Sequence, residues 1–129
     1  MQRVRGIGGV FFKATDPKGL AAWYERVLGV PVEGWGGAFF EWVAQRDARA
    51  GAGTVWTPFK ADTGYFAPSD KPFMLNFVVD DLDAMLAQAR AEGAQVEDKI
   101  LDEANGRFAW LLDPDGNKIE LWEPKPMPE

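Results

Sequence analysis

An internal repeat with a period of 64 to 66 residues constrains this chain more than any other feature. In each half an aspartate (Asp16, Asp81) precedes an amphipathic helix, and a glycine (Gly29, Gly93) follows it. A valine–glutamate pair and a Trp-x-Pro triplet then appear in the same order in both halves. A fixed period indicates duplicated architecture. Each copy reads as a strand, a helix and three further strands, so the repeat predicts two βαβββ modules.

The first half is predicted to hold one helix among short strands. Residues 7–14 alternate in the manner of a strand, and residues 17–28 carry apolar side chains every three or four positions. The second pattern is typical of an amphipathic helix, here capped by Asp16 and Gly29. We expect further strands at residues 30–33, 39–43 and 54–59.

The second half ends in a predicted hairpin over Gly106–Pro124. The turn Asp113–Gly116 combines a proline that presets φ with a glycine that accepts positive φ. In the last strand Ile119 and Leu121 flank Glu120, so we expect this carboxylate to point away from the apolar face. Before the hairpin the pattern predicts a strand at 73–79, a helix after Asp81 and a strand at 96–101.

These elements predict an α+β fold. One module is too small to cover both faces of its sheet. We therefore expect the two modules to form one curved, mixed sheet of about eight strands, with helices outside and a cleft inside. The chain is interpreted as a single domain, 1–129, with modules at 5–60 and 72–124 and a connector at 61–71.

Composition excludes several kinds of chemistry. The chain has no cysteine and no histidine, which rules out a disulfide framework, a thiolate nucleophile and an imidazole ligand or base. A net charge of −6 disfavours nucleic acid as a partner. No apolar run reaches the ~20 residues of a membrane span. The first residues do not follow the signal-peptide pattern, so we expect a cytoplasmic protein without membrane partners.

At this point the chain resembles the vicinal oxygen chelate superfamily, which includes glyoxalase I, extradiol dioxygenases, fosfomycin resistance enzymes and bleomycin resistance proteins. The stretches that carry the resemblance are GGVFFKATDPKGLAAWYERVLG, FMLNFVVDDLDAMLAQARAEGAQV and LDPDGNKIELWEP. The resemblance extends from about Ile7 to Pro124 and implies the cleft-bearing fold, together with a homodimer. It does not fix an activity, because this superfamily contains lyases, oxygenases, transferases and binding proteins.

The resemblance also implies four metal-ligand positions, which fall on Gly9, Thr54, Met74 and Glu120. Only Glu120 is a ligand type that this fold normally uses, and one carboxylate does not hold a divalent ion with useful affinity. We therefore expect a degenerate metal site and no cofactor. A divalent metal stays open as an alternative, because the second chain of a dimer could supply further carboxylates.

Glu120 is the candidate general base of the cleft. The alternative is that Glu120 is an inherited carboxylate bound to a neighbouring lysine, arginine or backbone amide. Polar and aromatic residues are expected around it, although aromatic side chains at strand spacing often belong to the core. The candidate ligand-binding residues are Phe11, Lys13, Trp42, Thr54, Trp56, Met74, Asn76, Arg107, Trp110 and Trp122.

The connector offers Tyr65 and Phe66 as a lid over the cleft, or as side chains that pack on the sheet edge. Three functions remain open. The first is a metal-independent binder of a small, partly aromatic or apolar molecule, similar to bleomycin resistance proteins. The second is a glyoxalase-like lyase or isomerase that uses Glu120 as base. The third is an interaction module with a vestigial cleft.

Overall fold

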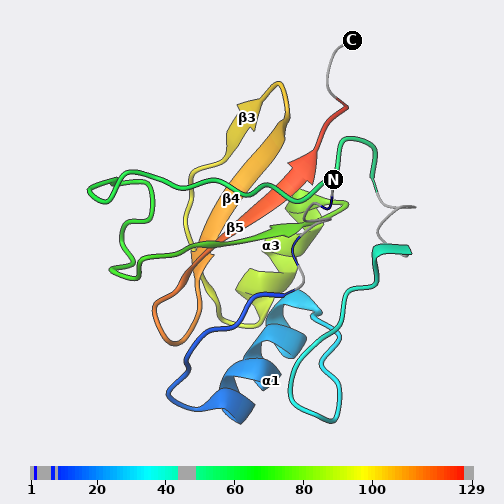
Figure 1. Ribbon diagram of the computed structural model, residues 1–129. Helices are drawn as coiled ribbons and strands as arrows, with labels where there is room; N and C mark the ends of the chain where they lie inside the picture. The colour runs from blue at the N-terminus through cyan, green and yellow to red at the C-terminus, as the bar shows by residue number, and fades with distance from the viewer. Residues whose placement is uncertain (1, 3–6, 8, 44–48, 127–129) are drawn as a thin grey trace.

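The computed structural model describes residues 2, 7, 9–43 and 49–126 (Figure 1). Its elements in chain order are α1 (Pro17–Leu28), β1 (Leu75–Val78), α3 (Leu82–Ala91), β2 (Gln95–Val96), β3 (Leu101–Glu103), β4 (Gly106–Leu112) and β5 (Lys118–Pro124). Within the described ranges, no helix has the length and apolar character that crossing a membrane requires.

The five strands form one open sheet in the order β1-β5-β4-β2, and β3 also pairs with β4. β1 lies parallel to β5, whereas the other pairs are antiparallel. A mixed α+β architecture is therefore confirmed. The second half follows its predicted order of strand, helix and further strands, and the predicted hairpin is β4 with β5.

The strand predicted at 96–101 is interrupted. β2 pairs Val96 with Leu111, and β3 pairs Leu101 with Phe108, so both belong to the same edge of β4. Between these two pairs, the segment that joins β2 to β3 has two residues more than the part of β4 that faces it. Such an insertion is a bulge, which bends the edge and leaves the extra residues without ladder partners.

Both helices begin and end where the sequence predicts. Asp16 and Asp81 each accept a hydrogen bond from the backbone N–H three residues ahead, at 3.1 and 3.0 Å. Gly29 and Gly93 follow the two helices with φ of 70° and 80°. These values lie in the left-handed region, which glycine enters without steric cost.

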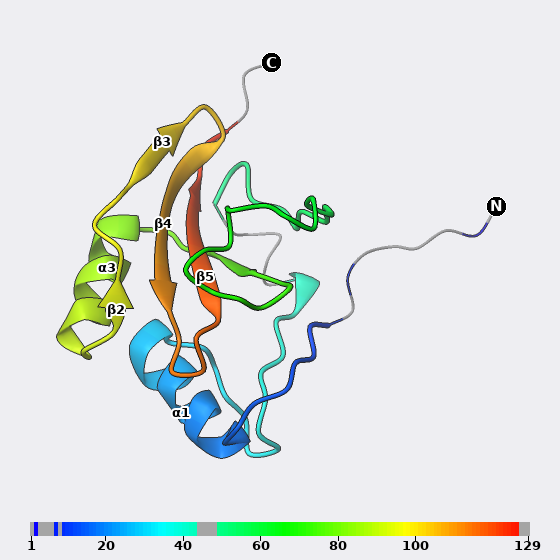
Figure 2. The ribbon, with the colours of Figure 1, turned by 90° about the vertical axis from the view of Figure 1, so that its left-hand side faces the viewer.

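The helices and the connector lie on opposite sides of the sheet (Figure 2). Leu111 pairs with Ile119 in the β4–β5 ladder, and both are fully buried. They join one core with apolar side chains of α1 and α3, including Val27 and Leu82. The alternate residues of the same strands, among them Glu120, face the connector side. This orientation of Glu120 is the one predicted from the alternation.

The turn between β4 and β5 is fastened to α1 through Asp113. Its carboxylate accepts hydrogen bonds from the Tyr24 hydroxyl at 2.7 Å and from the Asn117 side-chain amide at 2.6 Å. It also accepts from the backbone N–H groups of Asp115 and Asn117. Burial and the bond to Asp113 raise the pKa of Tyr24 above its ordinary value, so this hydroxyl remains a neutral donor.

The strands predicted at 7–14, 30–33, 39–43 and 54–59 do not form in the described residues, apart from one isolated bridge between Val32 and Ala38. Over the described ranges the sheet has five strands, so the expected sheet of about eight strands is not confirmed. Phe11 is 94% exposed and Trp56 is 76% exposed. A strand needs a neighbouring edge and a covered apolar face, and large apolar side chains of these segments remain uncovered.

Parts of the sequence-based prediction lie outside the described residues. They are Arg5, where the first module was predicted to start, and Gly8, within the strand predicted at 7–14.

Candidate functional site

Glu120 lies on the connector side of the sheet and accepts three hydrogen bonds. Asn76 on β1 donates through Nδ2 to Oε1 at 2.8 Å, and Trp110 on β4 donates through Nε1 to Oε2 at 2.9 Å. The third donor is the Tyr65 hydroxyl, which bonds to Oε2. Strand register explains the first two contacts, because Asn76, Glu120 and Trp110 are direct neighbours across β1, β5 and β4.

Tyr65 brings the connector onto this face. Its ring meets the Trp110 ring edge-on, with centroids 6.2 Å apart, and stacks on Phe59 at 5.6 Å. Lys118 donates through Nζ to the Tyr65 carbonyl at 2.7 Å. The same ammonium lies 5.3 Å from the centroids of both the Tyr65 and the Trp110 rings, within cation–π distance.

The pair of Tyr65 and Glu120 is asymmetric in exposure. Glu120 is buried, whereas Tyr65 is 37% exposed. Burial and the hydrogen bond to Glu120 raise the pKa of Tyr65 above its ordinary value. Tyr65 is therefore a neutral donor at physiological pH, and a substrate that gives Glu120 a proton must first take the place of this hydroxyl.

The surroundings of Glu120 differ from those of a metal ligand. All three of its partners are hydrogen-bond donors, which suits an ionised carboxylate. Among the described residues no group of three or more Asp, Glu, His or Cys side chains could hold a cation. At the other superfamily positions Gly9 has no side chain, Thr54 is exposed and Met74 is a half-buried thioether. This donor set does not fit a divalent metal.

The structure brings together only some of the predicted site residues. Asn76 and Trp110 contact Glu120, as expected. Trp122 lies on the same face but contacts other residues: it stacks on Phe108 and donates to the Asn105 carbonyl at 3.0 Å.

Five further candidates are exposed, and in the described part of the chain no hydrogen bond or ring contact joins them to Glu120. They are Phe11, Lys13, Trp42, Thr54 and Trp56. The predicted interaction of Glu120 with a lysine, an arginine or a backbone amide is also not what is seen, because phenol, indole and carboxamide groups surround it.

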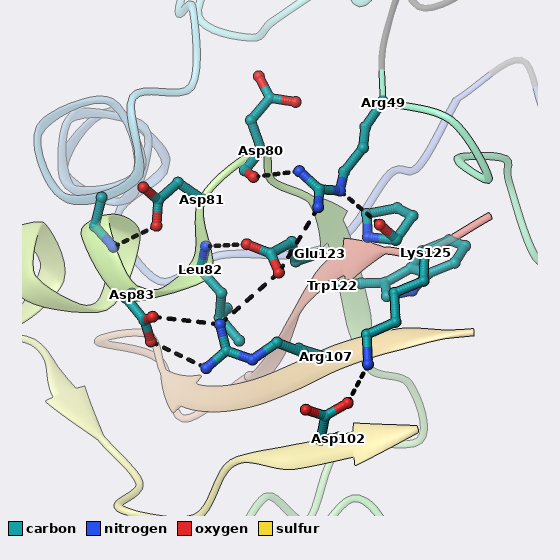
Figure 3. Close-up of polar contacts among 12 residues, drawn as sticks. Arg49, Asp80, Asp81, Leu82, Asp83, Asp102, Arg107, Trp122, Glu123 and Lys125 are labelled. Atoms are coloured by element: carbon teal, nitrogen blue, oxygen red, sulfur yellow. Dashed lines mark hydrogen bonds and ion pairs between the residues drawn. The ribbon is translucent and has the colours of Figure 1, made fainter. Parts of the chain in front are cut away.

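Arg107 was expected near the cleft but lies on the helix side of β4 (Figure 3). It forms two hydrogen bonds with the Asp83 carboxylate, at 3.1 and 3.3 Å, and approaches Glu123 at 3.8 Å. Glu123 in turn accepts from the Leu82 backbone N–H at 3.0 Å, at the start of α3. Residues 107 and 110 are an odd number of positions apart on β4, so their side chains point to opposite faces of the sheet, which explains the error.

Arg49 extends this cluster on the same side (Figure 3). It donates to the carbonyl oxygens of Pro124 and Asp80, at 2.5 and 2.8 Å, and lies 4.0 Å from Glu123. Positive and negative groups are paired throughout the cluster. Its role is therefore to join β4, β5, α3 and the segment at residue 49.

An apolar cavity of about 160 Å³ lies between α1, β1 and α3. Its lining includes Leu28, Phe77, Met85 and Leu121. Phe77 and Leu121 belong to the core side of their strands. The cavity therefore does not open onto Glu120 and has no polar side chain that would orient a ligand.

The list of candidate residues omits two residues of the site. Lys118 is two residues from Glu120 on β5, and strand alternation places it on the same face, but it was not counted among the ligand-binding candidates. Tyr65 was recognised only as a possible lid. The contact between its hydroxyl and Glu120 joins residues 55 positions apart, and no periodicity marks such a contact.

Comparison with known proteins gives a family match. Residues 9–122 match the family described as Glyoxalase-like domain. The search of curated proteins found no match.

Solved structures give partial similarities. An antibiotic-binding protein from Streptomyces sp. CB03234 is 39% identical over 40% of this chain, with a TM-score of 0.37. A glyoxalase/bleomycin resistance protein/dioxygenase superfamily member from Sphaerobacter thermophilus is 24% identical over 38%, with a TM-score of 0.35. The chain spans 41% and 40% of those two proteins. A protein from the mobile metagenome of V. Pseudocholerae is 21% identical over 85% of this chain and 86% of its own, with a TM-score of 0.47.

Proposed function

Because this chain belongs to the family of glyoxalase-like domains, we propose that it binds a small, partly aromatic molecule at the sheet face around Glu120, without a resident metal. The observation that carries the proposal is the combination of a buried carboxylate with two aromatic rings. Tyr65 and Trp110 both donate to Glu120 and also present ring surface beside it. A site with a few convergent polar groups on an apolar lining is typical of small-molecule recognition.

Metal independence follows in this proposal from the donor set. A divalent ion at Glu120 would have to replace hydrogen-bond donors that cannot act as ligands while they donate. We expect ligand affinity to be the same with and without EDTA, and metal analysis of the purified protein to find less than one equivalent. Loss of binding on chelation would contradict this part of the proposal.

The direct test is tryptophan fluorescence during titration with flat aromatic compounds such as 1,4-naphthoquinone, acridine and 2-naphthol. We expect saturable quenching in the wild type, and weaker binding with loss of most of the quenching in Trp110→Phe. Trp35→Phe is the matched control, since Trp35 is 71% exposed and lies outside the site. Equal effects of the two substitutions would contradict the assignment of the site.

An enzymatic function is the second candidate. In its favour, Glu120 already accepts a hydrogen bond from an ionisable hydroxyl, which is the position of a proton that a base would remove. A lyase or isomerase of this kind would lose turnover in Glu120→Gln while remaining folded. A vestigial cleft would instead show neither binding nor turnover, because the connector would cover Glu120 permanently.

We also propose that the first half completes the sheet as a second module and that two chains form a homodimer. The internal repeat and the exposed aromatic side chains Phe11, Trp42 and Trp56 support this arrangement. Lys13 and Thr54 would then line the far side of the cleft. Size-exclusion chromatography with light scattering tests the dimer, and a monomer at micromolar concentration would contradict it.

A further inference from the structure

Tyr65 has the chemistry of a ligand for the site that it covers. On the basis of the proposed function, we propose that the natural ligand carries a hydroxyaryl group, and that this group displaces Tyr65 and takes its place beside Glu120. The connector is then an internal competitor, and the chain itself indicates the class of compound that it binds.

The three donors to Glu120 differ in how they are held. Asn76 and Trp110 belong to β1 and β4, so strand register fixes them next to the carboxylate. Tyr65 belongs to the connector. If the connector moved, Glu120 would keep two donors and Oε2 would have room for a third. The replacement that restores the observed bonding is another neutral hydroxyl on a flat ring.

Charge narrows the choice of ligand. A carboxylate or phosphate on the ring would meet Glu120 at hydrogen-bond distance and be repelled. A neutral donor avoids this repulsion and reproduces the bond that Tyr65 makes. It also adds no second positive charge beside Lys118, whose Nζ already lies 5.3 Å from the centroids of the Tyr65 and Trp110 rings. The aromatic character follows from the edge-on contact with Trp110 and the stacking on Phe59.

The connector is fastened to the sheet at a single residue. In the part of the chain that the structure describes, the two hydrogen bonds between the connector, residues 61–71, and the sheet both involve Tyr65. Other hydrogen bonds of the connector are internal, for example from Ala67 to Gly64 and from Ser69 to Phe66. Release of Tyr65 would therefore free the connector without breaking any strand pairing.

This arrangement makes a quantitative prediction. A ligand that binds only when Tyr65 is displaced has an apparent affinity equal to its intrinsic affinity multiplied by the fraction of molecules in which Tyr65 is displaced. Tyr65→Phe removes the hydrogen bond to a charged acceptor and so raises that fraction. We therefore expect Tyr65→Phe to bind 2-naphthol about tenfold more tightly, or better, than the wild type does.

The experiment is isothermal titration calorimetry with 2-naphthol and with 2-methoxynaphthalene, which keeps the ring and the oxygen but cannot donate. We expect at least about tenfold preference for 2-naphthol in the wild type and in Tyr65→Phe. The indole N–H resonance of Trp110, assigned by its loss in Trp110→Phe, should shift on binding. Glu120→Gln should reduce the preference.

Tyr24→Phe is the matched control, because the Tyr24 hydroxyl also donates to a carboxylate but on the far side of the sheet. It should leave both affinities unchanged. If the two probes bind equally, or if Tyr65→Phe binds no better than the wild type, the role of Tyr65 is refuted while aromatic binding at Trp110 stands. If no aromatic compound binds to either protein, the proposed function fails as well.

Discussion

The two tyrosines of this protein make the same bond in opposite settings. Tyr24 donates to Asp113, and both are buried among regular elements of the fold. Tyr65 donates to Glu120 from a connector and is 37% exposed. The comparison shows that a phenol–carboxylate bond can hold a fold together or hold a site closed. Which of the two roles the bond has depends on whether the tyrosine hydroxyl can reach water once its bond to the carboxylate is broken.

The largest difference between the two pairs should appear when the acceptor is removed. Asp113→Ala leaves the Tyr24 hydroxyl and the Asn117 amide buried without an acceptor, so we expect a loss of about 3–5 kcal/mol in the free energy of unfolding. Glu120→Ala should cost less, about 2–3 kcal/mol, because Tyr65 and the exposed Asn76 can turn to solvent and only the Trp110 indole stays buried without an acceptor. Urea unfolding of both variants measures the difference, and equal losses would remove the distinction.

A smaller difference should appear at high pH. The pKa of each tyrosine is raised, first by burial and then by its carboxylate partner. A raised pKa in the folded state gives stability that is present below the ordinary tyrosine value of about 10 and is lost as the pH rises above it. We expect the free energy of unfolding to fall above about pH 10 in the wild type, less steeply in Tyr65→Phe, and least steeply in Tyr24→Phe.

The readout is the difference between these slopes, from urea unfolding at a series of pH values, because the difference removes every contribution that the three proteins share. Tyr24→Phe should have the larger effect because Tyr24 is buried, whereas solvent screens the partly exposed Tyr65. If the free energy of unfolding of Tyr24→Phe falls with pH as steeply as that of the wild type, the Tyr24 hydroxyl does not remain neutral in the folded wild-type protein.

The smallest effect concerns Lys118, which fastens the connector through the Tyr65 carbonyl. Lys118→Met keeps the aliphatic stem and removes the ammonium. We expect a loss of global stability of less than about 1 kcal/mol and faster amide exchange confined to residues 60–72. Hydrogen exchange followed by mass spectrometry measures both. Unchanged exchange in the connector would mean that Tyr65 alone is sufficient to hold it.

The sequence predicted the orientation of Glu120 correctly, because a regular strand determines it. Alternation around the Asp113–Gly116 turn placed Glu120 on the face away from the core, and Asn76 and Trp110 are its neighbours in the sheet. Period-2 patterns carry this information because a strand exposes alternate residues to each face. The prediction for Arg107 was wrong because it did not follow this rule: residues 107 and 110 are an odd number of positions apart on β4 and therefore face opposite sides.

The rest of the site and half of the fold could not be predicted in this way. The contact between Tyr65 and Glu120 depends on the path of an irregular connector, which local patterns do not encode. Residues 7–14 and 54–59 have the composition of strands, yet a strand also requires a partner edge, and its own sequence does not supply one. An apolar side chain such as Phe11 indicates that a segment can be buried, but not which surface covers it.

The position of β5 has a consequence for synthesis of the protein. β5 comes last along the chain among the described strands, yet it lies between β1 and β4 and joins them. As the chain leaves the ribosome, β1 and α3 emerge without the strand that they need. The sheet can assemble only after residues 118–124 have cleared the exit tunnel. Until then the apolar faces of the earlier elements are open to chaperones, and synthesis interrupted before β5 leaves a chain for degradation.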